Sequence, residues 1–292
     1  MGKTKRRWGD RKDGVWLKDL DSMHLIGSYL LRNRADREAF IEETVDLTRV
    51  REYLSKKNAA NPGSTYTIFQ VICAAIVKTL VQRPKLNRFI SGRRVYQRNY
   101  ISLAFVCKNS FHDDSAESLL VLYVNEDNTI DDLQKLMNEK IKEVREQGQL
   151  DHSTDLMNKL GRLPRCILAV IFAVVRALDY FGRVPWWLIK EDPDFASIYL
   201  TNLGSINLNA GYHHLNNWGT NSLFIVIGKK GLRPFYDKNG EVEMKDTIKI
   251  GITLDELIVD GYYYAKSIKL FQYIIEHPEL LDRPANEEIT YD

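Results

Sequence analysis

The hydrophobic positions of this chain repeat with two different periods. Strands are predicted where apolar and polar residues alternate, or where a short apolar run is unbroken, in residues 39–47, 100–108, 119–124, 196–202, 222–227 and 247–254. Helices are predicted where apolar residues return every three or four positions, in residues 48–57, 68–80, 129–144 and 261–275. Thr48 and Asp260 stand where two of these helices need an N-cap. Helices interrupt the strands irregularly, and a turn at 237–240 joins the last two strands. This order predicts an α/β fold, a two-layer sandwich with a mixed β-sheet.

A basic stretch precedes these elements. Lysine and arginine recur in the first twelve positions, at Lys3, Lys5, Arg6, Arg7, Arg11 and Lys12. No apolar run follows them, so a secretory signal is not expected. We expect residues 1–14 to form a flexible, solvated tail. Residues 15–292 are expected to form one domain, because 44% hydrophobic and 11% aromatic residues can build a sizeable core.

Residues 151–193 are predicted to be an inserted helical segment. Cys166–Val175 is an unbroken apolar run that ends at Arg176, which is too short for the roughly 20 residues of a membrane-spanning helix. Residues 163–190 therefore have several interpretations: a buried helix or one that covers a subunit contact, an apolar wall for an acyl chain, or a patch on a membrane surface. The last interpretation rests on Trp186, Trp187 and the flanking arginines.

Charge and cysteine content disfavour several classes of function. The 41 Lys and Arg residues nearly balance 39 Asp and Glu, a net charge of +2, so no nucleic-acid partner is expected. The 3 cysteines are far apart and lack a zinc-like spacing, which indicates a reduced, cytoplasmic protein without disulfides or a metal site. No glycine-rich phosphate loop is present, so a kinase, ATPase or dinucleotide enzyme is not favoured.

Three motifs follow one another along the chain. Tyr66–Asn87 reads as a long apolar helix that ends in Arg-Pro-Lys-Leu-Asn. Ala196–Ser205 ends in Tyr-Leu-Thr-Asn-Leu-Gly-Ser, and Asp255–Gly261 reads Asp-Glu-Leu-Ile-Val-Asp-Gly before a helix. Together they resemble the catalytic domain of the dihydrolipoamide acyltransferases of 2-oxo acid dehydrogenase complexes, whose fold chloramphenicol acetyltransferase shares. The similarity covers most of residues 40–280, apart from the inserted segment.

The resemblance implies a function. In such enzymes the acyl group comes from a coenzyme A thioester, and a histidine is the general base on the thiol or hydroxyl of the acceptor. A hydroxyl on the Ser-Asn-Leu-Gly strand hydrogen-bonds the oxyanion, and the sites lie at the subunit interfaces of a trimer. We therefore expect acyl-coenzyme A as co-substrate, a small-molecule acceptor and a homotrimer.

Carried onto this chain, the resemblance assigns the oxyanion hydroxyl to Thr201. Threonine keeps a donor, so oxyanion stabilisation is chemically feasible, although Thr201 is equally a β-branched strand residue. Asn202 and Gly204 match the turn that follows. Asp260 and Gly261 match the Asp-Gly pair that orders the active-site loop.

Glu256 stands where the family has its catalytic histidine. An imidazole titrates near pH 6.5 and suits proton removal at neutral pH, whereas a glutamate near 4.3 is a poor base unless burial raises its pKa by units. Glu256 is therefore either the base or a surface or structural carboxylate. His213 and His214, just after the motif strand, are candidates for a relocated base, or else polar loop or subunit-contact histidines.

Two hypotheses remain open. The first is a coenzyme A-dependent acyltransferase. It is expected to be a stand-alone protein and not the core of a dehydrogenase complex, because the chain has no Asp-Lys-Ala lipoyl-attachment turn. The second is a non-catalytic trimeric scaffold or ligand-binding homologue that has lost its general base. Glu256 favours the second, and Thr201 with the Asp260-Gly261 pair favours the first.

Overall fold

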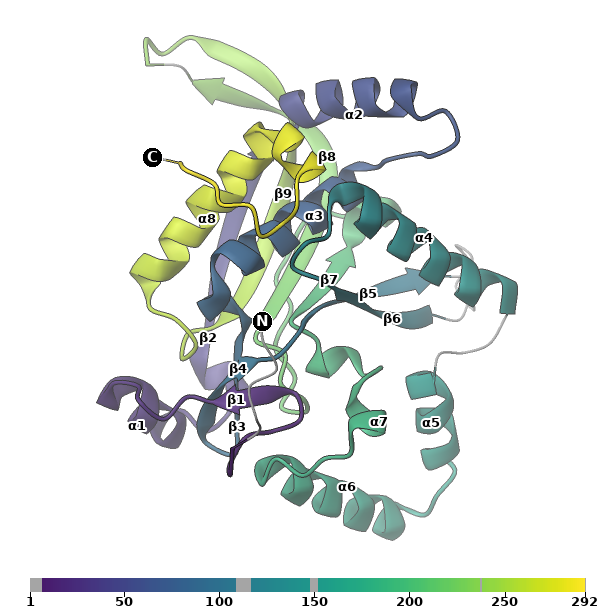
Figure 1. The fold of residues 1–292 in the computed structure, drawn as a ribbon, viewed down its shortest axis with the longest axis vertical. Coiled ribbons are helices and arrows are strands. Elements are labelled where there is room, and N and C mark those ends of the chain that lie inside the picture. The colour runs from purple at the N-terminus through teal and green to yellow at the C-terminus, as the bar shows by residue number, and fades with distance from the viewer. Residues whose placement is uncertain (1–6, 109–116, 148–151, 237, 292) are drawn as a thin grey trace.

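The computed structural model describes residues 7–108, 117–147, 152–236 and 238–291. Within these ranges, six strands form the main sheet in the order β2-β9-β8-β7-β5-β6 (Figure 1). Their bounds are Glu38–Asp46 (β2), Ile101–Lys108 (β5), Glu117–Val124 (β6), Ile198–Asn202 (β7), Leu223–Tyr236 (β8) and Val242–Asp255 (β9). β7 runs parallel to both β5 and β8, and the other pairs are antiparallel. The predicted mixed sheet is therefore confirmed.

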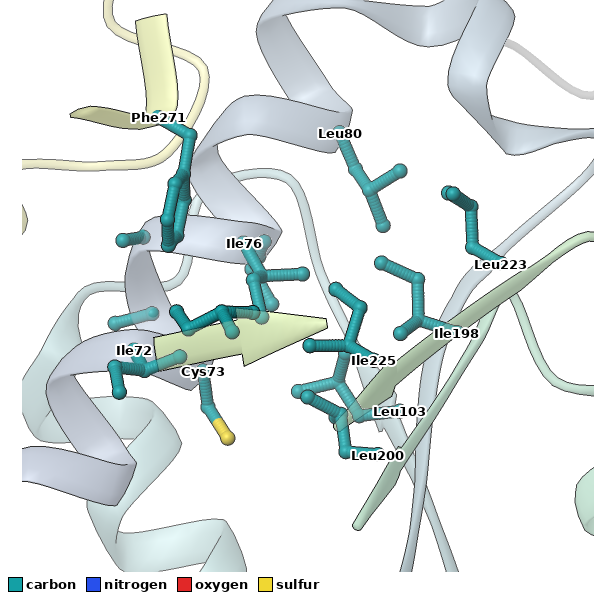
Figure 2. Close-up of a cluster of buried hydrophobic side chains, with 14 of the residues drawn as sticks. Ile72, Cys73, Ile76, Leu80, Leu103, Ile198, Leu200, Leu223, Ile225 and Phe271 are labelled. Atoms are coloured by element: carbon teal, nitrogen blue, oxygen red, sulfur yellow. The ribbon is translucent and has the colours of Figure 1, made fainter. Parts of the chain in front are cut away.

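One face of this sheet carries the main helical layer. Its helices are Thr48–Ala60 (α2), Ile68–Gln82 (α3), Ile130–Gln147 (α4) and Gly261–Glu276 (α8). α3 lies at the centre and is buried along most of its length, with Ile72, Ile76 and Leu80 facing apolar residues of the sheet (Figure 2). Thr67 caps α3, because its hydroxyl accepts from the Gln70 amide. The predicted cap at Thr48 is wrong: Leu47 is the N-cap, and the Asp46 carboxylate accepts from the Thr48 amide.

A second, smaller sheet holds the N-terminal segment. Its described strands are Gly14–Trp16 (β1), Arg88–Ser91 (β3) and Arg94–Arg98 (β4), in the order β1-β4-β3, and none of them was predicted. Residues 1–6 of the predicted tail lie outside the described residues. For residues 10–14 the tail prediction is wrong. Arg11 is 3% exposed and forms ion pairs with Asp13 and with Asp179, a partner far along the chain.

The inserted segment forms a lobe of three helices at one end of the molecule (Figure 1). They are His152–Leu160 (α5), Arg165–Tyr180 (α6) and Trp186–Ile189 (α7); residue 151 of the predicted segment lies outside the described ranges. No residue of α6 is buried, so the interpretation as a buried helix is wrong for the single chain. In the described ranges, no helix combines the length and the apolar composition needed to cross a bilayer.

The remaining elements are short. Ser22–Leu30 forms α1, capped by Asp21. Short 3-10 turns occupy Arg34–Arg37, Pro84–Asn87, Pro193–Phe195, Leu203–Ile206 and Pro278–Asp282.

Candidate active site

Thr201 lies on the face of the sheet that is turned away from α3. It pairs with Val226 of β8, which packs with Leu215 and Phe224 in a separate apolar cluster on that face. The Thr201 side chain is half-buried, and among the described residues its hydroxyl has no hydrogen-bond partner. A free hydroxyl donor therefore stands one residue before the carboxyl end of β7.

Asn202 and Gly204 form the turn after β7, as the motif predicts. A Cβ on Gly204 would lie within 2.4 Å of the Gly228 carbonyl oxygen, so only glycine fits there. Ser205 donates to the Asn202 carbonyl at 2.7 Å and closes the turn. Sequence reasoning placed these residues in the correct turn but gave no reason for the glycine, because Gly228 lies on another strand.

A cleft of about 660 Å³ opens at this turn. Asn202, Gly204 and Ser205 form one wall, and the opposite wall consists of α2 and the first turn of α3. Arg51 and Lys230 supply positive charge; Arg51 pairs with Asp246 at 2.7 Å, whereas Lys230 has no ion-pair partner among the described residues. The cleft has the size and the cationic rim that suit an elongated, phosphate-bearing ligand.

The loop of residues 207–222 crosses the outer face of the sheet beside Thr201. Two glycines of the sheet make room for it: a Cβ on Gly228 would lie 2.2 Å from the Ala210 nitrogen, and one on Gly251 would lie 2.0 Å from the Gly211 carbonyl. The loop then turns back, and the His213 ring stacks on Phe224 with centroids 4.2 Å apart. His213 therefore lies on the same face as Thr201.

The geometry of His213 favours a free ring nitrogen. Its Nδ1 lies 2.8 Å from the His214 carbonyl oxygen, which only accepts hydrogen bonds. In the neutral ring this contact places the proton on Nδ1 and leaves a lone pair on Nε2. Phe224, on which His213 stacks, pairs with Tyr199, and Tyr199 is two residues before Thr201 on β7. The side chains of His213 and Thr201 are therefore roughly 7 Å apart along the strand direction. His214 stacks on His213 at 4.5 Å and is also exposed.

Two carboxylates that sequence reasoning missed anchor this loop. The Trp218 indole donates to Asp192 at 2.7 Å, and the Asn216 amide donates to Asp194 at 2.8 Å. Burial, and then the charge of Asp194, raise the pKa of Asp192 to about 7. Their position in Glu-Asp-Pro-Asp just before the motif strand was the only sequence signal, and it resembles any polar turn.

Glu256 follows the carboxyl end of β9 and is exposed. Its amide donates to the Arg37 carbonyl at 3.0 Å. Its neighbour Asp255 is fully buried and forms an ion pair with Arg37, whose Nε lies 3.0 Å from Oδ2. Burial raises the pKa of Asp255, and the positive charge of Arg37 opposes that rise. The buried carboxylate of this motif is therefore Asp255, and Glu256 itself points to solvent in the single chain.

Asp260 caps α8, which confirms the N-cap prediction. Its carboxylate accepts from the Tyr263 amide at 2.7 Å. Hydrogen bonding to Tyr263 lowers the pKa of Asp260, which is exposed. Gly261 is the first residue of α8, and a Cβ there would meet nothing within 4 Å. The pair therefore orders the start of a helix, and it contacts neither Thr201 nor His213.

Within one chain, Thr201 and Glu256 lie at different ends of the sheet. The strand register aligns Thr201 with Val226 and Gly251, and Glu256 is five residues beyond Gly251 on the adjoining strand. At about 3.4 Å per residue this is roughly 17 Å along the strands. Thr201 and His213 of one chain share a face of the sheet, whereas Glu256 of the same chain is too far from Thr201 to act with it. In the described part of the chain, no group of three potential ligands could hold a metal ion.

Comparisons with known proteins bear on the fold. No protein-family model and no curated protein matches the sequence. Among solved structures, a probable dihydrolipoamide acetyltransferase from Listeria monocytogenes has a TM-score of 0.57 at 12% identity, covering 95% of this chain and 98% of that chain. The dihydrolipoamide acetyltransferase of Azotobacter vinelandii has a TM-score of 0.56 at 15% identity, covering 89% and 88%. Chloramphenicol acetyltransferase has a TM-score of 0.53 at 12% identity, covering 90% and 98%. The chain therefore has the fold of dihydrolipoamide acyltransferase catalytic cores and of chloramphenicol acetyltransferase.

Proposed function

We propose that this protein transfers an acyl group from a coenzyme A thioester to the hydroxyl or thiol of a small acceptor. The observation that carries the proposal is the cleft that ends at the turn after Thr201. A thioester whose nucleotide lies near Arg51 and Lys230 would bring its acyl carbonyl toward the carboxyl end of β7. Thr201 then donates to the oxyanion of the tetrahedral intermediate. A lipoyl group is not required, and the protein is expected in the cytoplasm.

The general base in this proposal is His213. Its free Nε2 takes the proton from the acceptor as the acceptor attacks the thioester carbonyl, and later returns that proton to the departing coenzyme A thiolate. A separation of roughly 7 Å along the sheet suits two groups that act on opposite sides of one reacting carbon, each about 3 Å from it. Glu256 of a neighbouring copy is the second candidate, because the single chain keeps it far from Thr201.

A homotrimer remains part of the proposal. Large apolar side chains are exposed near Glu256, on α1 and on the pair formed by Phe40 and Tyr212. Gly27 of α1 packs directly on Leu257, the residue after Glu256. This apolar surface supports an interface at the Glu256 end of the sheet. The alternative, a non-catalytic scaffold, shares this surface but needs neither Thr201 nor His213.

The test is thioester turnover with a panel of alcohols, amines and thiols, monitored by the release of free coenzyme A. We expect His213→Gln to lower the rate by about 10²–10⁴-fold and His214→Gln to change it little. If the wild type binds acyl-coenzyme A but no acceptor accelerates thiol release, the scaffold hypothesis replaces the enzyme.

Mixing two inactive variants decides between the two bases. If Glu256 acts across an interface, Thr201→Val mixed with Glu256→Gln recovers activity, because some interfaces then combine both intact groups. If His213 acts with the Thr201 of its own chain (in cis), no activity is recovered when Thr201→Val is mixed with His213→Gln. Recovery in that second mixture would overturn the cis assignment.

A further inference from the structure

The inserted lobe leaves an apolar helix uncovered. In α6 only Leu168, Ile171, Val175 and Asp179 turn partly toward the protein. The other positions between Cys166 and Val175 are apolar and exposed; Val170 is 63% and Val174 53% exposed. A helix that is apolar on nearly all sides is normally buried against other parts of a structure. This helix therefore needs a cover that the single chain does not provide.

The lobe is held firmly in that exposed position. Asp179, in the last turn of α6, accepts from the buried Arg11 at 2.9 Å, and Ser91 of the small sheet donates to the same carboxylate at 3.2 Å. Gly92 approaches Tyr180 so closely that a Cβ would lie 2.0 Å from the Tyr180 carbonyl oxygen. At the other side, Phe172 contacts the Trp218 ring edge to face. The apolar face is thus presented by a docked helix.

Positive charge surrounds this apolar face. Residues 160–189 hold four arginines and one acid, Asp179, which is already paired with Arg11. All four are exposed, and in the described part of the chain none forms an ion pair: Arg162, Arg165, Arg176 and Arg183. Arg165 and Arg176 share one side of α6, because eleven positions make about three turns. An apolar strip bordered by unpaired arginines complements an anionic surface with an apolar interior.

The basic character continues beyond the end of α6. A cavity of about 260 Å³ beside Asp179 and Tyr180 is lined by Arg32, Arg34, Arg37 and Arg93. Within the described residues, neither Arg32 nor Arg93 has an acidic partner. Large aromatic side chains border the lobe as well: Phe181 is 73% and Trp187 57% exposed. Tryptophan and arginine together are typical of the boundary between headgroups and acyl chains.

We propose that residues 160–190 of the inserted lobe dock on an anionic phospholipid membrane, with α6 lying in the plane of the interface. Val170 and its apolar neighbours enter the boundary of the acyl chains, and the arginines contact lipid phosphates. This inference is independent of the proposed acyl transfer, because no residue of the lobe belongs to the cleft at the turn after β7 or to the loop of residues 207–222.

The test is co-sedimentation of the full chain with phosphatidylcholine vesicles, with and without phosphatidylglycerol. We expect binding only when phosphatidylglycerol is present. Val170→Glu should weaken it at least tenfold, because a carboxylate replaces an apolar side chain at the interface. The triple variant Arg162→Gln, Arg165→Gln, Arg176→Gln should weaken it roughly a hundredfold, because each arginine near an anionic surface contributes about 1 kcal/mol. All four sites are exposed, so folding is expected to be unchanged and is checked by circular dichroism.

Leu232→Glu is the matched control. Leu232 is 66% exposed on the distant β8–β9 hairpin, and its substitution should leave binding unchanged. Recovery of the wild type in the supernatant with phosphatidylglycerol would overturn the proposal. Equal vesicle binding by the wild type and Val170→Glu would also overturn it. A third contradicting result is a wild-type protein that forms an oligomer, never binds vesicles, and dissociates on the Val170→Glu substitution. That last result would identify a second copy of the chain as the cover.

Discussion

The carboxyl end of β7 brings together the groups on which the proposed acyl transfer depends: Thr201 with a hydroxyl that has no partner among the described residues, a glycine turn, and a cleft with Arg51 and Lys230. The carboxyl end of β9 is equally ordered but carries different groups. There, a buried ion pair fixes the loop, Asp260 caps a helix, and Glu256 is an exposed carboxylate. The comparison teaches that an ordered loop and a chemically equipped site need not coincide within one sheet.

The loop of residues 207–222 connects the two ends. It begins at the turn after β7, crosses β8 and β9 over glycines, and returns to place His213 on Phe224. The Leu215 amide donates to Glu38, which pairs with Asp255 at the start of β2. A replacement base on this loop would move the proton-transfer group from one end of the sheet to the other.

The largest expected effect concerns stability at the β9 end. Arg37→Met leaves the buried Asp255 carboxylate without its ion-pair partner, and we expect a loss of about 3–5 kcal/mol in the free energy of unfolding, measured by urea titration. The loss should shrink toward acidic pH, where a protonated Asp255 needs no cation. Arg49→Met, at an exposed pair with Glu52, should change stability by about 0.5 kcal/mol or less. Equal effects of the two substitutions would mean that the ion pair does not order the loop.

The next effect concerns catalysis at the β7 end. Thr201→Val keeps the shape of the side chain and removes the donor, so the rate of acyl transfer should fall by roughly 10²–10³-fold. Thr201→Ser keeps a hydroxyl and should retain most of the rate. Steady-state kinetics on folded protein measures both. A Thr201→Val enzyme with normal turnover would remove the oxyanion role from this residue.

A pH dependence follows from the anchor of the loop. Because burial raises the pKa of Asp192 from its ordinary 3.8 to about 7, the folded state binds more protons than the unfolded state between these values. The free energy of unfolding therefore decreases as pH rises through this window, by a few kcal/mol at most, at about 1.4 kcal/mol per pKa unit. In Asp192→Asn this pH-dependent loss is absent. The free energy of unfolding of the variant, relative to that of the wild type, should therefore increase from pH 4 to about 7. A pH-independent difference would contradict the assignment.

The smallest expected effect concerns Lys230 at the rim of the cleft. Lys230→Gln should raise the KM for acyl-coenzyme A by up to about tenfold and leave kcat unchanged, because in the proposed binding mode the ammonium at the rim of the cleft contacts a phosphate and not the reacting atoms. With an N-acetylcysteamine thioester, which lacks the nucleotide, the substitution should have no effect. An equal change in KM for both thioesters would place the nucleotide elsewhere.

The sequence was sufficient for the main sheet and its helices, because their residues carry clear periodicity. The alternation around Leu103 and the spacing of Ile72, Ile76 and Leu80 reflect burial that the structure confirms. The small sheet was missed because arginines hide its pattern. Arg98 is 2% exposed and donates to the carbonyls of Phe195 and Thr220, so a charged residue there behaves as a core residue.

The N-terminal tail failed as a prediction for a related reason. Arg11 and Asp13 resemble a solvated charge run, and Asp179, the half-buried partner of Arg11, is more than 160 positions away. The prediction that α6 is a buried helix was wrong in the opposite way, because apolar residues that looked buried are exposed. Composition predicts burial only if something covers the helix. At the candidate site, Thr201 and the histidines were found from a motif and from residue type. That they lie on the same face of the sheet was not predicted, because it depends on strand register and on the path of a loop.

Calorimetric titration with acetyl-coenzyme A tests most directly whether the cleft at the turn after β7 is a thioester site. Ser55 is exposed and lines the cleft, whereas the adjacent exposed Lys56 does not line it. We predict that the wild type and Lys56→Trp bind with the same affinity, and that Ser55→Trp binds at least tenfold more weakly because the indole fills the cleft. Absence of binding by the wild type, or unchanged binding by Ser55→Trp, would contradict the account.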